Sequence, residues 1–144
     1  MKKWILPMLA MFAMLVGCTE RPHIITSYYT VTPDQWEQSI TTYDNGTYDV
    51  NYYYSSWENV DITPDVIEFG VVLAYYIDDD NRDNMLPYTI YLKDDAGAFW
   101  QERIEFDIER GVITFKIKDT DFNTAQSMAN IGTMKFKVSV IRDY

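Results

Sequence analysis

Apolar residues recur at every second position in several segments of this chain, which is the period of a strand with one buried face. Residues 99–108 place Ile104, Phe106 and Ile108 on one side and charged residues on the other. Residues 112–118 place Ile113, Phe115 and Ile117 on one face. Residues 133–142 alternate in the same way, with one face made of Met134, Phe136, Val138 and Val140. Seven strands are expected in all, over residues 24–31, 47–57, 69–77, 88–93, 99–108, 112–118 and 133–142.

The tyrosine-rich residues 47–57 follow the same alternation. Strict period two places Val50, Tyr52 and Tyr54 on one face of this strand. It places Tyr53 on the opposite face. Tyrosine is favoured in strands and pairs well across them, so the composition agrees with the pattern.

Short turn signals separate the expected strands. Asp44–Gly46 contains Asn-Gly, which tolerates positive φ, and Asp94–Gly97 and Glu109–Gly111 are typical of hairpin loops. Thr32–Gln35 and Thr63–Asp65 are typical of helix starts, because Thr can cap a helix and Pro suits its first turn. No long amphipathic pattern follows either of them, so each predicts no more than two helical turns.

The connections between the strands determine the expected architecture. None has the strand–helix–strand spacing that parallel pairing requires, so the sheets should be antiparallel. Residues 24–144 are therefore expected to form a single all-β domain. The predicted fold is an antiparallel two-sheet sandwich of the immunoglobulin-like kind with about seven strands. A small closed barrel is the alternative.

The N-terminus has the pattern of a signal helix. Lys2 and Lys3 form a cationic head, and residues 4–16 are an almost wholly apolar run. Such a run is too short for a bilayer core, which needs about 20 residues. Its length and flank are those of a cleaved secretory signal.

The chain's only cysteine ends this segment, in the sequence Leu15-Val16-Gly17-Cys18. These residues resemble the lipobox of bacterial lipoproteins. The resemblance implies that Cys18 carries lipid and becomes the first mature residue. Residues 1–17 are then the signal peptide and residues 18–23 a short lipidated tether. Two or three acyl chains would hold the domain stably, at about 0.8 kcal/mol per buried methylene.

The residue after the cysteine bears on location. In many Gram-negative lipoproteins, Asp at this position favours retention in the inner membrane. The resemblance, with Thr19 there instead, implies the cell envelope and the outer membrane of a Gram-negative bacterium. The first predicted partner is therefore the membrane, to which the lipid on Cys18 would anchor the protein.

Charge and composition exclude several functions. The net charge is −10, which repels a phosphate backbone and argues against nucleic-acid binding. His23 is the only histidine and Cys18 the only thiol, so a Ser-His-Asp or Cys-His centre is not expected. Zinc sites use several Cys or His ligands. The chain is therefore predicted not to be an enzyme and to carry no catalytic residue, no cofactor and no metal.

Two acidic loops leave calcium open as an alternative. Asp119, Asp121 and Asn123 have the Asp-x-Asp-x-Asn start of a calcium loop. The match then fails, because Thr124 stands where that loop requires Gly. Residues 78–83 supply further carboxylates without a repeated ligand spacing. A solvated connection is the other interpretation of both loops.

The tryptophans suggest a binding surface. Trp36, Trp57 and Trp100 lie near expected strand ends or turns, and exposed rings at the rim of a sandwich could stack on a sugar or a partner protein. Tyr53 is the fourth candidate for such a patch. The simpler interpretation, which we favour, is that these rings pack in the core and across strands.

The mature chain also resembles a group of small uncharacterised lipoproteins common in Bacteroidota, which has no established activity. The resemblance rests on the strand ending at Trp57 and on Asp61–Val66, Gly70–Tyr75, Leu86–Tyr88 and Phe136–Ile141. The expected role is a lipid-anchored, non-catalytic binding module for a glycan, a peptide or an envelope protein. The alternative is a structural or assembly component of the envelope with no small-molecule ligand.

Overall fold

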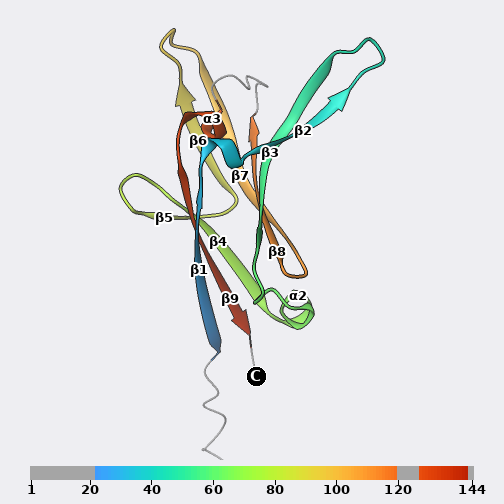
Figure 1. Ribbon diagram of the computed structural model, residues 1–144. Coiled ribbons are helices and arrows are strands. Elements are labelled where there is room, and N and C mark those ends of the chain that lie inside the picture. Colours follow the sequence, from blue (N-terminus) through green and yellow to red (C-terminus); the bar gives the residue numbers. More distant parts are fainter. Residues whose placement is uncertain (1–21, 120–126, 143–144) are drawn as a thin grey trace, which may run out of the picture.

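The computed structural model describes residues 22–119 and 127–142 and contains two antiparallel sheets (Figure 1). One sheet has the order β1 (His23–Val31), β9 (Met134–Arg142), β4 (Val71–Ile77) and β5 (Asp83–Met85). The other has the order β2 (Glu37–Thr42), β3 (Tyr48–Glu58), β8 (Val112–Asp119), β7 (Phe99–Glu109) and β6 (Tyr88–Lys93). We call them the four-stranded and the five-stranded sheet.

The predicted all-β, two-sheet antiparallel sandwich is confirmed, and the barrel alternative is wrong. The described residues form nine strands rather than about seven. The two that the pattern missed are β2, which has little apolar alternation, and the three-residue β5, which lies at the end of an acidic loop. The predicted signal peptide lies outside the described residues.

Side chains from the two sheets meet in one core. Phe115 of β8 and Phe136 of β9 are fully buried and stack across the sandwich, with ring centroids 4.0 Å apart. The predicted inward faces of β8 and β9 are confirmed, because Ile113 and Ile117 flank Phe115 in the core and Val138 follows Phe136. Burying each such side chain contributes roughly 1.5–3 kcal/mol.

A bulge breaks the alternation predicted for β3. Ser39 pairs with Tyr52 and the next residue, Ile40, pairs with Val50, so Asn51 is an extra residue on β3. An extra residue reverses which face the following side chains take. Val50 and Tyr53 therefore both reach the core, and the strict alternation predicted across this strand is wrong at Asn51.

Both predicted helix starts are confirmed. Thr32 precedes η1 (Pro33–Gln35), and its backbone N–H donates to Gln35 Oε1 at 2.9 Å. Thr63 precedes α2 (Pro64–Phe69), and its Oγ1 accepts from the backbone N–H of Val66 at 3.3 Å. A third short helix, α3 (Met128–Ile131), leads into β9.

Candidate functional site

The aromatic patch expected from the sequence does not form. Trp36, Trp100 and Tyr53 are buried, and Trp57 is half-buried against the core. The Trp36 ring meets Phe136 edge-on at 6.4 Å between centroids. The hypothesis of an exposed patch of these rings is therefore wrong, and the interpretation that they pack inside is confirmed for Trp36, Tyr53 and Trp100. Strand phase turns Tyr53 and Trp100 inward, whereas Trp36 lies between η1 and β2.

In the part of the chain that the structure describes, the longest strand edge without a partner strand is the outer edge of β1. Among the described residues, β1 pairs with β9 along all nine of its positions and with no strand on its other side. It contains no Pro, Asp, Glu, Lys or Arg, and its register with β9 has no bulge. Such an edge presents unpaired backbone N–H and C=O groups that can pair with another chain.

The other three edge strands are shorter or carry features that discourage pairing. β5 has only three residues, and Asp83 within it forms an ion pair with Lys137. β2 contains the irregular step between Ser39 and Ile40 and starts with Glu37. β6 has six residues and ends with Lys93. Short strands, bulges and edge charges are the usual protections against strand addition, and β1 lacks them.

A hollow of about 340 Å³ lies beside β1. Tyr29 contributes its hydroxyl group, which accepts a hydrogen bond from Asn59 Nδ2 at 2.8 Å. Burial is the largest cause that raises the pKa of Tyr29, and the charge of Asp61 raises it further. The full lining is polar and acidic with one exposed aliphatic side chain: Ser27, Tyr29, Glu58, Asn59, Val60 and Asp61.

A second, smaller hollow of about 220 Å³ lies on the outer face of the five-stranded sheet. Lys116 forms an ion pair with Asp107 and lies 5.2 Å from the ring centroid of Tyr52. The hydrogen bond to Asp107 raises the pKa of Lys116. Beside it the Tyr54 hydroxyl donates to Glu37 at 2.6 Å. This face therefore carries aromatic rings, hydroxyl groups and charged side chains next to one another.

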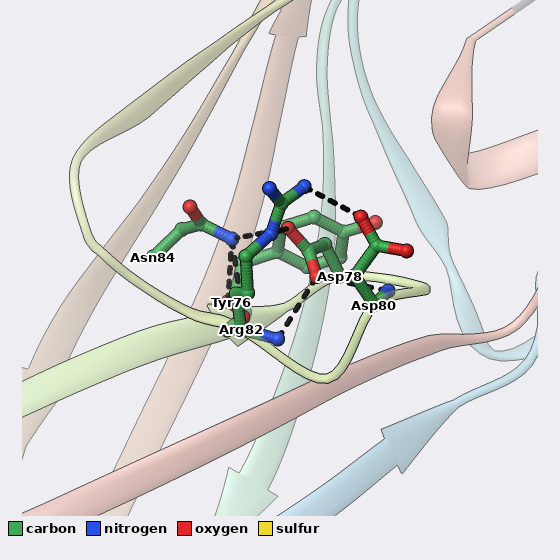
Figure 2. Close-up of polar contacts among 5 residues, drawn as sticks. All are labelled: Tyr76, Asp78, Asp80, Arg82 and Asn84. Atoms are coloured by element: carbon green, nitrogen blue, oxygen red, sulfur yellow. Dashed lines mark hydrogen bonds and ion pairs between the residues drawn. The ribbon is translucent and has the colours of Figure 1, made fainter.

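In the acidic loop after β4, the Asp78 carboxylate accepts hydrogen bonds from residues that follow it closely in the chain (Figure 2). Asp78 Oδ1 accepts from the backbone N–H groups of Asp80 and Arg82 at 3.0 and 2.9 Å. Asp78 Oδ2 accepts from Arg82 Nε at 2.9 Å and from Asn84 Nδ2 at 3.2 Å. These bonds, first of all the one from the Arg82 backbone, hold the pKa of Asp78 below its usual range. The Arg82 guanidinium thus forms ion pairs with the carboxylates of both Asp78 and Asp80.

One buried carboxylate, Glu102 on β7, escaped the sequence analysis. It is fully buried and accepts from Trp100 Nε1 at 3.2 Å and from the backbone N–H of Met128 at 2.8 Å. Burial is the largest cause that raises its pKa, and nearby Asp119 adds to the shift. The alternation that puts Trp100 and Ile104 inside also puts Glu102 inside, so the signal was present. Glu102 attaches α3 to the five-stranded sheet.

The remaining candidates are only partly covered by the structure. Asp119 is the last residue of β8 and pairs with Glu102, whereas Asp121 and Asn123 lie outside the described residues. Cys18 lies outside them too. No group of three metal-ligating side chains occurs among residues 22–119 and 127–142. In the same ranges no helix has the length and apolarity to cross a bilayer.

Comparisons with protein-family models, with curated proteins and with solved structures give no match.

Proposed function

We propose that this chain is a lipid-anchored cell-envelope protein whose sandwich binds an extended segment of a partner protein along β1. The observation that carries the proposal is the nine-residue outer edge of β1, which has no partner strand among the described residues. In strand addition, the backbone hydrogen bonds supply affinity and every second side chain of the added segment supplies specificity.

The hollow beside β1 indicates which side chains the partner should carry. Glu58 and Asp61 make its rim acidic, and the exposed Val60 adds one apolar contact. A basic residue in the added segment would be attracted by these carboxylates. We therefore expect a segment in which Lys or Arg recurs at alternate positions among β-branched or aromatic residues.

The anchor in this proposal is the lipid on Cys18. Four residues separate Cys18 from His23, where β1 begins. The domain would thus be held close to the membrane, in reach of envelope proteins only. No step of covalent chemistry is assigned to it.

Site-specific cross-linking in cells tests this function. A photoreactive amino acid replaces Thr26 on β1, and the matched control replaces Thr41 on β2, because both are exposed threonines of edge strands. We expect an adduct with an extended, basic segment of another protein at Thr26 only, and expect Glu58→Lys to reduce its yield about tenfold. Equal adducts at Thr41, or none at Thr26, would contradict the proposal.

The same experiment separates the alternative role. A structural component that assembles copies of itself through paired β1 edges would give an adduct of two copies of this chain. Glu58→Lys would not reduce that adduct selectively, because β1 itself carries no basic side chain apart from His23.

A glycan ligand is the second candidate, and the hollow around Tyr52 and Lys116 favours it. Aromatic rings there lie beside hydroxyls and an ion pair, which suits a ligand with apolar and polar faces. Titration of envelope oligosaccharides into the protein should then give a signal that Tyr52→Ala abolishes. A Tyr28→Ala control, which changes an exposed tyrosine of the other sheet, should leave the signal unchanged.

A further inference from the structure

Three aliphatic side chains form a row across the outer face of the four-stranded sheet, two of them exposed and the central one, Ile141, half-buried. Ile24 of β1 and Val71 of β4 are both paired with Ile141 of β9. Paired residues share a face of the sheet, so the three lie side by side. Ile24 is 57% exposed and Val71 is 48% exposed. On the outer face, this row is the first one at the end of the sheet where β1 begins.

The end of α2 extends this row. Phe69, the last residue of α2, is 79% exposed and stands two positions before Val71. Gly70 between them lies so close to β9 that an added Cβ would be 2.8 Å from the carbonyl oxygen of Ile141. Figure 1 shows α2, the end of β9 and the start of β1 at the same end of the molecule. We call Ile24, Phe69, Val71 and Ile141 the apolar end.

The same face becomes polar with distance from this end. In the next row, Thr26 and Ser139 share a hydrogen bond between their hydroxyls at 3.3 Å. One row further, Lys137 forms an ion pair with Asp83 and lies 4.4 Å from the ring centroid of Tyr75. Leu73 of β4, in the row of Thr26 and Ser139, is half-buried, and the exposed Met85 of β5 is paired with Tyr75. On β1, β4 and β9, the exposed aliphatic side chains of this face are therefore Ile24 and Val71, both at one end.

The position of the apolar end relative to Cys18 suggests what covers it. The chain takes five residue-to-residue steps from Cys18 to His23, and an extended chain spans at most about 3.6 Å per step. The start of β1 would then lie within about 18 Å of the lipid attached to Cys18. Of the two ends of the sandwich, the one that carries Ile24 is the one that the tether brings to the membrane.

The acidic side chains of α2 indicate which kind of lipid surface the apolar end would contact. Asp65 and Glu68 of α2 are exposed close to Phe69. They would be repelled by a surface of anionic lipid. Contact is therefore expected with the interface of zwitterionic lipid, which carries no net charge. There, apolar side chains enter the boundary between headgroups and acyl chains.

We infer that the apolar end is a membrane-contact surface, which rests in the lipid–water interface and sets the orientation of the domain. This inference rests on the lipid anchor of the proposed function. With the apolar end in the interface, the strands of the four-stranded sheet rise away from the membrane. The β2–β3 hairpin, at the opposite end in Figure 1, points into the aqueous phase.

Depth-dependent fluorescence quenching tests this orientation in the full, lipidated chain. Because lipid occupies the sulfur of Cys18, a cysteine introduced elsewhere is the only reactive thiol. Val71→Cys and Phe69→Cys probe the apolar end. Ile40→Cys is the matched control, because Ile40 is an edge-strand aliphatic with 50% exposure on β2. Each variant receives an environment-sensitive dye and is reconstituted in phosphatidylcholine vesicles.

A nitroxide lipid with a shallow spin label should quench the dye at positions 69 and 71 at least threefold more than at position 40. Equal quenching at all three positions would overturn the inference. Protection of positions 69 and 71 from aqueous quenchers without quenching by the nitroxide lipid would also overturn it, because a protein would then cover the apolar end.

Failure of the anchor itself gives a different result. If Cys18 carries no lipid, the otherwise unmodified chain takes up the thiol-reactive dye and does not float with the vesicles. If the chain floats and excludes the dye but positions 69 and 71 remain in water, the anchor holds and the membrane-contact surface is wrong.

Discussion

Two carboxylates of this protein, Glu102 and Asp78, accept similar hydrogen bonds with opposite results. Asp78 receives four bonds in a surface loop, two of them from Arg82, and its pKa is lowered. Glu102 receives bonds from Trp100 and Met128 inside the sandwich, and its pKa is raised. The bonds to each lower its pKa, so burial decides the difference.

The comparison also separates two structural roles. Asp78 closes a turn made of its own neighbours, all within six residues along the chain. Glu102 joins β7 to the start of α3, which lies 26 residues further on. Loss of a local closure affects one loop, whereas loss of a long-range bond under a helix affects how the sandwich is capped.

Glu102→Ala should have the largest effect. It leaves the Trp100 Nε1–H and the Met128 N–H without their acceptor in a buried site. An unsatisfied buried donor costs about 1–3 kcal/mol, and relief of the buried charge offsets part of that, so we expect a loss of about 2 kcal/mol in the free energy of unfolding. Urea denaturation at pH 7 measures it.

The matched change in the loop is Asp78→Ala, which should cost clearly less by the same measurement. If the two substitutions destabilise the protein equally, the contrast between a long-range and a local carboxylate is wrong.

Glu102→Gln should change how stability depends on pH. The raised pKa means that the folded chain binds the Glu102 proton more tightly than the unfolded chain. Stability should therefore fall as the pH rises from the ordinary glutamate value of 4.5 through the raised pKa. Gln keeps one side-chain oxygen, which can accept from both Trp100 Nε1 and the Met128 N–H without a charge. The variant should therefore lack this decline and match or exceed the wild-type melting temperature at pH 7.

Melting curves from pH 3 to pH 8 distinguish the two carboxylates. Asp78 acts in the opposite sense, because its stabilisation is present above the ordinary value of 3.8 and is lost as the pH falls through its lowered pKa. Glu102→Gln should leave that acid limb in place. A wild-type profile that rises steadily from pH 4.5 to pH 7 would count against a raised pKa for Glu102.

Much of the fold could be predicted because period two is a local signal. The inward faces of β8 and β9 follow from every second residue, and the Thr-Pro-Asp sequences gave the starts of η1 and α2. The bulge at Asn51 could not be predicted this way, because it depends on how β2 pairs with β3. The three-residue β5 likewise exists only because β4 offers it a partner.

Less of the candidate site could be predicted. Which strand lies at an edge is set by sheet order, so the sequence of β1 alone did not single it out. The tryptophans gave the wrong surface, because position near a turn does not determine which way a ring points. Glu102 was within reach of the pattern, since it shares the phase of Ile104, but the tendency of acidic residues to face solvent hid it.

The smallest effect is expected within the acidic loop itself. Asp78→Ala removes the acceptor of the Asp80 and Arg82 backbone N–H groups, so these two amides should exchange with solvent several-fold faster. Asp78→Asn keeps an Oδ1 acceptor. It loses the Oδ2 acceptor, and with it the bond from Asn84 Nδ2 and the ion pair with Arg82, whose side chain is 70% exposed. It should therefore retain the amide protection of the wild type.

Amide exchange followed by NMR separates the two roles of Asp78. Equal loss of protection in both variants would mean that the charge, and not the Oδ1 acceptor, closes the turn. Unchanged exchange in Asp78→Ala would mean that Asp78 does not hold the loop, and the contrast with Glu102 would then rest on burial alone.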